Sequence, residues 1–143
     1  MSIITFISDF GRTDHYAASV VASILKYNPN NKVVNISHDI AKYDLSHAAY
    51  VFKNVYKEFP EESTHIIAVN NSDVINDIIL FKMDNHYIIT FDSGIISLLD
   101  TKENISVIKL GGDTFPSFPE KFMGELASKL ASGINYTTLG SPL

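Results

Sequence analysis

Short apolar runs alternate along the chain with longer stretches in which apolar residues recur at helical spacing. The first run, residues 3–7, is almost continuously apolar, as expected of a strand that is buried on both faces. Further strands are predicted at residues 32–36, 64–69, 78–83, 86–91 and 104–110. Asp84 and Asn85 separate two of these strands and predict a tight hairpin between them.

Three stretches have the spacing typical of an amphipathic helix. The first follows Thr13 and Asp14, either of which can cap it, and its apolar face consists of Tyr16, Val20, Val21, Ile24 and Leu25. The second follows Asp44, a candidate cap, and its apolar face consists of Leu45, Ala48, Ala49, Phe52, Val55, Tyr56 and Phe59. The third opens at Pro119 and Glu120 and carries Phe122, Leu126 and Leu130 on one side.

Strands that alternate with helices predict an α/β fold, a Rossmann-like three-layer sandwich with a mostly parallel central sheet. Ligands of such sheets bind beyond the carboxyl ends of the strands. The segments expected at that edge are residues 9–16, 37–44 and 70–77.

Composition narrows the class of protein. The 143 residues, 45% hydrophobic and 19% charged, fit a single globular domain over residues 1–143. The net charge of −5 and the scattered basic residues argue against a nucleic-acid or anionic-membrane partner. Without cysteine, thiolate catalysis and disulfides are excluded, and the histidines have no metal-site spacing, so no metal is expected. No membrane span or signal peptide is recognisable, which predicts a cytoplasmic location.

The turn after the first strand is the most informative local feature. There, the Asp9 carboxylate can accept two hydrogen bonds from a ribose diol, and Gly11 lets the backbone approach a ligand. A purely structural alternative remains, in which Asp9 caps the following helix. The nearby pair His38 and Asp39 fits a local hydrogen-bonded structure better than a general base or metal site.

Polar and aromatic residues in other loops are weaker candidates. The Tyr43 ring can stack on a purine or serve in the core. Asn70 and Asn71 suit either recognition of a polar ligand or an ordinary surface loop. Ser93 lies in a turn with Gly94 and can bind an anion, although a simple turn is the favoured interpretation.

Several motifs in order resemble the SAM hydroxide adenosyltransferases, the family that includes the SAM-dependent fluorinases and chlorinases. Residues 4–16, ITFISDFGRTDHY, resemble the family's opening strand and its Thr-Asp-Phe-Gly turn. Residues 34–40, VNISHDI, resemble its Val-Asp-Ile-Ser-His-x-Ile segment, and residues 91–97, FDSGIIS, its Pro-Asp-Asn-Gly-Leu-Leu-Ser turn. Residues 139–143, LGSPL, are similar to the Leu-Gly-x-Pro-Leu that closes the family's first domain.

The resemblance implies that hydroxide or halide attacks the ribose carbon bonded to the sulfur of SAM, without a cofactor, and releases methionine. Asp9 matches the carboxylate expected to hold the ribose diol, and Tyr43 matches a position that lines the SAM pocket. Tyr16 stands where the fluorinases carry a small hydroxyl residue near the ribose. The candidate residues for binding SAM or adenosine are therefore Asp9, Phe10, Gly11, Asp14, Tyr16, Tyr43, Asn70, Asn71 and Ser93.

The chain departs from the family at the positions that activate water, which are an Asp, an Arg and a His. Neutral Asn70 stands at the Asp position, Arg12 is the only arginine, and residues 112–122 contain no histidine. No catalytic residue is therefore assigned. Family members also carry a carboxyl-terminal β domain and form trimers whose SAM site lies between subunits. We expect residues 1–143 to be the amino-terminal domain without that β domain.

Three hypotheses follow. The chain binds SAM or adenosine with little turnover, or it is an active SAM-cleaving enzyme completed by self-association as a homotrimer or by a separate partner protein. In the third, it is a structural or interaction protein that kept the fold.

Overall fold

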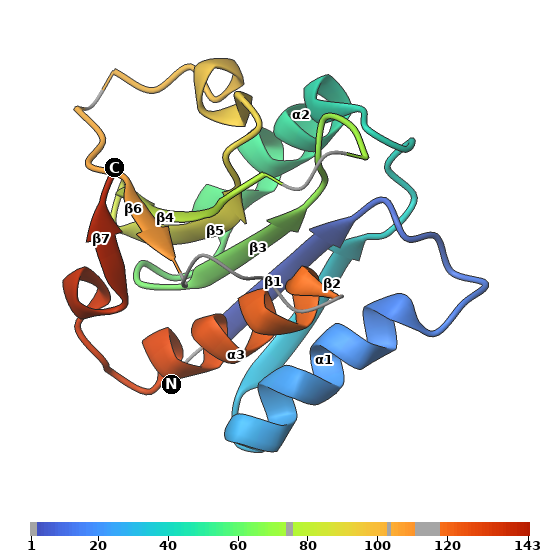
Figure 1. The fold of residues 1–143 in the computed structure, drawn as a ribbon, viewed down its shortest axis with the longest axis horizontal. Helices are drawn as coiled ribbons and strands as arrows, with labels where there is room; N and C mark the ends of the chain where they lie inside the picture. Colours follow the sequence, from blue (N-terminus) through green and yellow to red (C-terminus); the bar gives the residue numbers. More distant parts are fainter. Residues whose placement is uncertain (1–2, 74–75, 103, 111–117) are drawn as a thin grey trace.

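The structure, a computed structural model, describes residues 3–73, 76–102, 104–110 and 118–143. A seven-stranded sheet forms its centre, with the strands in the order β2-β1-β3-β5-β4-β6-β7 (Figure 1). The strands are β1 Ile3–Ser8, β2 Lys32–Ser37, β3 Thr64–Ala68, β4 Ile78–Met83, β5 His86–Phe91, β6 Ile108–Leu110 and β7 Gly140–Pro142.

The two halves of the sheet differ in strand direction. Strands β2, β1, β3 and β5 run parallel to one another, whereas the β5–β4, β4–β6 and β6–β7 pairs are antiparallel. The sheet is therefore mixed. In its parallel half, α1 connects β1 to β2 and α2 connects β2 to β3, whereas the chain passes from β3 to β5 through β4. Because β1 lies between β2 and β3, it is an internal strand, and its carboxyl end has a neighbouring strand on each side.

Helices cover both faces of the sheet, which confirms the predicted three-layer α/β fold (Figure 1). Helices α1, Tyr16–Tyr27, and α3, Pro119–Ala131, lie side by side on one face. Helix α2, Leu45–Val55, covers the other face. Among the described residues, the remaining elements are the short 3-10 helices η1 Tyr56–Glu58, η2 Ile95–Leu98 and η3 Tyr136–Thr138.

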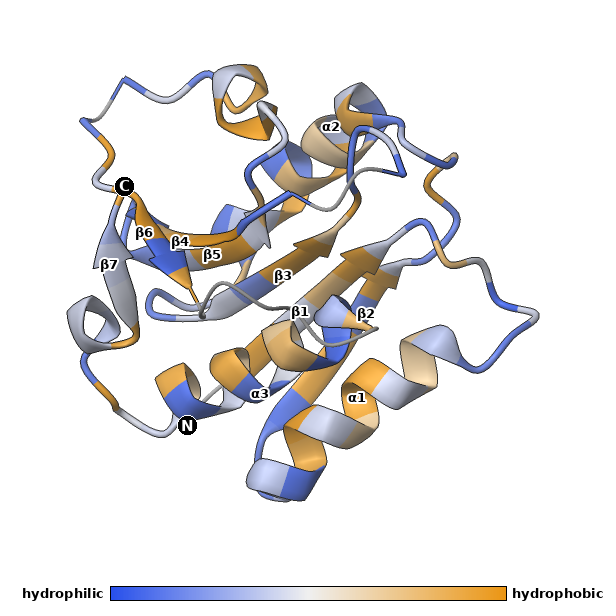
Figure 2. Ribbon diagram, viewed as in Figure 1, coloured by the Kyte–Doolittle hydropathy of each residue, from blue (hydrophilic) through white to orange (hydrophobic). Residues whose placement is uncertain are grey.

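Strand β1 shows how the sheet separates two cores. Ile4 and Phe6 point into the core beneath α1 and α3, whereas Ile7 points into the core beneath α2. Successive side chains of a strand alternate between its faces, and all three are fully buried because helices cover both faces. The central strands are accordingly mostly hydrophobic in Figure 2, whereas the helices carry both kinds of residue.

Most predicted elements are confirmed within one or two residues. The hairpin forms between β4 and β5, and Asp84 and Asn85 both have positive φ angles, 51° and 63°, as a two-residue turn of this kind requires. The last predicted strand is shorter than expected: its pairing with β4 ends at Ile108, so residues 104–107 have no ladder. Strand β7 was not predicted, because its three residues are too few for a periodic signal.

The caps of the first two helices differ. Asp44 accepts a hydrogen bond from the backbone N–H of His47 at 3.0 Å and caps α2 as predicted. The predicted cap of α1 is wrong: His15 occupies the cap position without a side-chain bond. Asp14 bonds instead to the adjacent His15, through its backbone N–H and its ring Nδ1.

The apolar face predicted for the first helix also needs a correction. Val20 and Ile24 are fully buried, but Tyr16 and Leu25 are 43% and 37% exposed. Tyr16 is the first residue of α1, and Leu25 is turned about 100° around the helix from Ile24. None of the described helices is long and apolar enough to cross a membrane.

Candidate functional site

A cavity of about 240 Å³ opens at the carboxyl end of β1, where Asp9 follows the strand. We call it the Asp9 cavity. It collects residues from the turn after β1, the loop before α2, the ends of β3 and β5, and the start of α3. The lining residues are Asp9, Phe10, Lys42, Tyr43, Ala68, Asn70, Ser72, Asp73, Phe91, Pro119 and Glu120.

Asp9 faces this cavity and does not cap a helix. Its Oδ2 accepts a hydrogen bond from the backbone N–H of Tyr43 at 3.2 Å. Burial raises the pKa of the Asp9 carboxyl above its ordinary value, and the positive charge of Lys42 partly opposes that shift. The structural alternative, in which Asp9 caps α1, is excluded because α1 has no side-chain cap.

Tyr43 forms one wall of the cavity in an unusual backbone conformation. Its φ angle is +63°, in the left-handed region that bulky residues rarely adopt. Two hydrogen bonds stabilise this conformation. The Tyr43 backbone N–H donates to Asp9, and the Tyr43 hydroxyl donates to Asp73. Lys42 Nζ lies 5.5 Å from the centre of the Tyr43 ring, a cation–π distance.

Glu120 brings a second carboxyl group into the cavity from the first turn of α3. Burial raises the pKa of the Glu120 carboxyl, and the negative charge of Asp9 adds to that rise. Sequence analysis missed Glu120 and Lys42 as site residues. The local pattern marks Glu120 only as part of a helix start. Lys42 lies in the segment 37–44 expected at this edge, but no pattern distinguishes it from its neighbours there.

Asn70 also lines the cavity, but its side chain is occupied in shaping the loop after β3. Its Oδ1 accepts from the backbone N–H of Asn71 at 2.8 Å and from the Asn76 side chain at 2.5 Å. The Asn71 side chain points elsewhere, and its Nδ2 donates to the backbone carbonyl of Ser93 at 3.3 Å.

Neither Asn71 nor Ser93 is among the residues that line the Asp9 cavity. The Ser93 hydroxyl is buried and has no hydrogen-bond partner among the described residues. The structure thus places these two candidates beside the cavity rather than in its wall.

Gly11 and Asp14 lie in a different hollow, of about 390 Å³, together with His38 and Asn35. Gly11, with a φ angle of +75°, donates its backbone N–H to the carbonyl of His38 at 2.7 Å. Tyr16 packs instead against two aromatic rings. The centre of its ring lies 6.0 Å from that of Phe10 and 5.7 Å from that of Phe118. Of the nine candidates, the Asp9 cavity therefore unites Asp9, Phe10, Tyr43 and Asn70.

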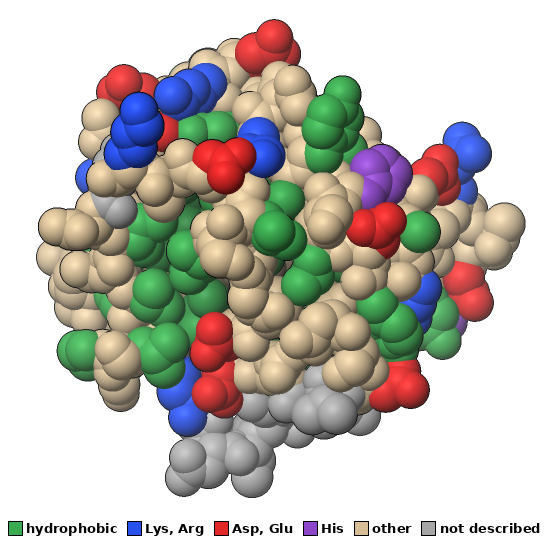
Figure 3. All heavy atoms as spheres, turned by 90° about the horizontal axis from the view of Figure 1, so that it is seen from above, with side chains coloured by type: hydrophobic (Ala, Val, Ile, Leu, Met, Phe, Trp, Pro, Cys, Tyr) green, Lys and Arg blue, Asp and Glu red, His purple; other side chains and the backbone are tan. Residues whose placement is uncertain are grey.

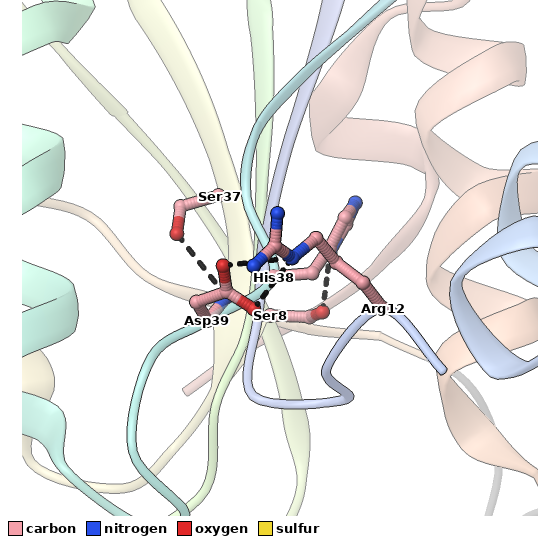
Figure 4. Close-up of polar contacts among 5 residues, drawn as sticks. All are labelled: Ser8, Arg12, Ser37, His38 and Asp39. Carbon is pink, nitrogen blue, oxygen red and sulfur yellow. Dashed lines mark hydrogen bonds and ion pairs between the residues drawn. The ribbon is translucent and has the colours of Figure 1, made fainter. Parts of the chain in front are cut away.

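His38 joins the ends of β1 and β2 beneath the turn (Figure 4). Ser8 Oγ lies 2.5 Å from His38 Nδ1, and Asn35 Oδ1 lies 2.8 Å from His38 Nε2. Because Asn35 Oδ1 can only accept, Nε2 carries the proton, and Nδ1 accepts from the Ser8 hydroxyl. Burial lowers the pKa of His38, which favours this neutral form.

The Ser8–His38 pair is a structural clamp rather than a nucleophile and base, because Ser8 is fully buried and no substrate can reach it. The local hydrogen-bonded role expected for His38 and Asp39 is therefore the one observed. Arg12 closes the same turn from outside, with its Nε 3.0 Å from an Asp39 carboxylate oxygen (Figure 4).

Among the described residues, no group of three or more His, Asp or Glu side chains could hold a metal ion. On the face shown in Figure 3, Lys and Arg side chains are interspersed with Asp and Glu rather than gathered in one basic patch.

The sequence of this chain matches a known protein family. The sequence model of the SAM hydroxide adenosyltransferase N-terminal domain matches residues 4–140. A curated relative, the (R)-S-adenosyl-L-methionine hydrolase of Methanocaldococcus jannaschii, is 27% identical over 122 residues. That match covers 80% of this chain and 46% of the relative, so the chain spans about half of that protein's length.

Solved structures share the fold. An uncharacterized conserved protein from Thermotoga maritima superposes with a TM-score of 0.86 at 20% identity, over 98% of this chain and 58% of its own. A conserved hypothetical protein from Thermus thermophilus superposes with a TM-score of 0.82 at 25% identity, over 100% of this chain and 59% of its own.

Proposed function

The chain belongs to the SAM hydroxide adenosyltransferase family, and on that premise we propose that it binds SAM or adenosine in the Asp9 cavity with little or no cleavage of SAM. The observation that carries the proposal is the position of Asp9. It is a half-buried carboxylate at the carboxyl edge of an internal strand, where α/β sheets bind their ligands.

Asp9 has the hydrogen-bonding capacity that a ribose diol requires. An ionised carboxylate offers about four lone-pair sites. The Tyr43 N–H uses one site on Oδ2, and the shape of the cavity leaves the carboxylate in contact with its interior. Two hydroxyls on neighbouring carbons can therefore donate to Asp9 together.

The remaining walls suit a purine nucleoside. Phe10, Tyr43 and Phe91 contribute aromatic rings to the lining, and such rings stack on a base or cover the apolar edge of a ribose. The volume of about 240 Å³ is below the range of roughly 300–1,000 Å³ that is usual for sites enclosing a drug-sized ligand. A cavity of this size suits part of SAM, with the rest enclosed by another chain or domain.

The low turnover follows from chemistry. Cleavage of SAM by water needs a group that accepts a proton as the oxygen attacks. The amide of Asn70 cannot serve as such a base, and its oxygen is already occupied by Asn71 and Asn76. Completion of the site by self-association as a homotrimer, or by a separate partner protein, is part of the proposal.

An active SAM hydrolase is the second candidate function. It is favoured by one observation, the presence of the Glu120 carboxyl group in the cavity where the family's own water-activating positions are changed. A carboxylate there can accept a proton if water reaches the ligand beside it.

Calorimetric titration with SAM and with adenosine, paired with chromatographic detection of adenosine, tests the proposal. Micromolar binding without release of adenosine is the expected result. Catalytic release of adenosine from SAM would favour the active enzyme instead. Failure to bind either ligand would leave a protein that has the fold alone.

A further inference from the structure

The lining of the Asp9 cavity has an excess of negative groups. Asp9, Asp73 and Glu120 each contribute a carboxyl group, whereas Lys42 contributes the one ammonium group among the lining residues. Asp73 is engaged by the hydroxyl of Tyr43. Asp9 and Glu120 are the two carboxyl groups that are half-buried in the cavity.

Asp9 and Glu120 come from distant parts of the chain and influence each other. Asp9 follows β1 and Glu120 begins α3, and the charge of Asp9 contributes to the raised pKa of Glu120. Lys42 is within electrostatic reach of both, yet its Nζ lies over the Tyr43 ring and forms no ion pair with either carboxyl group. The lining therefore holds more carboxyl than ammonium groups, and a positively charged ligand group would favour the ionised form of Asp9 and Glu120 that burial disfavours.

Resting on the proposed function, we infer that Glu120 is a specificity residue that selects the positively charged sulfonium form of an adenosyl ligand over its neutral thioether counterpart. The sulfur of SAM is bonded to C5′ of the ribose. Asp9 and Glu120 line the same small cavity, so a ribose held by Asp9 leaves the sulfonium, one carbon from the sugar, within this cavity if C5′ faces Glu120. The neutral thioether lacks the charge and gains nothing from Glu120.

Glu120 could instead have a purely structural role at the start of α3. An acidic side chain in the first turn of α3 can stabilise that helix by interaction with its dipole. Such a role would change thermal stability and would affect charged and neutral ligands equally. The ratio of the two affinities separates the roles.

The probes are SAM and S-adenosylhomocysteine, which differ only in one methyl group and the positive charge on sulfur. Calorimetric titrations would compare the wild type with Glu120→Gln and with Glu125→Gln. Glu125 is the matched control, because it lies on the same helix with a 47% exposed side chain and pairs with Lys129 at 3.7 Å, outside the Asp9 cavity.

We expect Glu120→Gln to weaken SAM binding by about tenfold while the affinity for S-adenosylhomocysteine stays unchanged. Glu125→Gln should leave both affinities as in the wild type. Glu120→Asp, which keeps the charge, should keep the preference for SAM and serves if the glutamine variant folds poorly. An unchanged ratio of affinities in Glu120→Gln overturns the inference alone. Failure of the wild type to bind either ligand overturns the proposed function as well.

Discussion

The backbone N–H of Tyr43 donates to Oδ2 of Asp9 across 3.2 Å, and this bond joins the turn after β1 to the loop before α2. It orients the carboxylate toward the Asp9 cavity and supports the left-handed backbone of Tyr43. A residue in that conformation costs free energy, of order 1–3 kcal/mol. Its retention at the wall of a cavity, stabilised from both sides, is the pattern expected of a ligand site.

Replacement of Asp9 by alanine should weaken adenosine binding by ~1–3 kcal/mol, because the charge-assisted bonds to the ribose hydroxyls are lost. Calorimetric titration measures the change. Asp14→Ala is the control, since Asp14 is an acidic residue of the same segment that lies in the other hollow. An unchanged affinity in Asp9→Ala would reject the ribose role of this carboxylate.

Replacement of Gly124 by alanine should destabilise the fold by ~1–3 kcal/mol. A Cβ at this position would lie 2.9 Å from the backbone oxygen of Val20 and 2.2 Å from Ser23 Oγ, so α1 and α3 would have to separate. The clash should outweigh the roughly 1 kcal/mol by which alanine favours an unpacked helix. Urea denaturation measures the difference, and Lys121→Ala, exposed on the same helix, should change stability little. A more stable Gly124→Ala would show that the helices adjust without cost.

Replacement of Asp44 by alanine should cost ~1 kcal/mol of stability, because the cap bond to the His47 N–H is lost at the start of α2. Asp44→Asn keeps an oxygen acceptor and should retain most of the stability. Thermal unfolding of the two variants beside the wild type tests this. Equal losses in both would assign the effect to charge rather than to the cap.

Stability should fall as the pH is lowered from about 6.5 toward 3. Burial, followed by the neighbouring His86, lowers the pKa of His65 to about 3, and burial also lowers the pKa of His86. The unfolded chain therefore binds protons near pH 6.5 that the folded chain does not, so the stability present above that pH is lost as the pH falls toward 3.

The buried geometry explains why His65 stays neutral. Its Nδ1 lies 2.6 Å from Thr5 Oγ1 and its Nε2 lies 3.0 Å from His86 Nδ1. The urea midpoint should be measured at several pH values, and its dependence on pH should be weaker in His65→Gln than in the wild type. The control His47→Gln changes an exposed residue of α2 and should keep the wild-type slope. Equal slopes in all three proteins would contradict the assignment.

Local pattern was sufficient for the elements that local forces decide. The apolar run of β1, the Asp84–Asn85 turn and the Asp44 cap depend on residues close in sequence, and all three are observed. The cap predicted at Thr13 or Asp14 is wrong, because Asp14 bonds to the adjacent His15, and the pattern of residue types does not distinguish these two local bonds. The short β7 depends on a distant partner strand, and no local signal announces it.

By itself, the sequence determined the α/β class, the family, and Asp9, Tyr43 and Asn70 as residues at one edge of the sheet, because parallel strands bring their carboxyl ends together. Only the tertiary structure decided that Lys42 and Glu120 join them, while Gly11 and Asp14 turn toward another hollow. The physical reason is that α3 reaches β1 through packing of buried side chains such as Met123 and Leu126. The position of a helix start over a sheet depends on such contacts, which no spacing along the chain records.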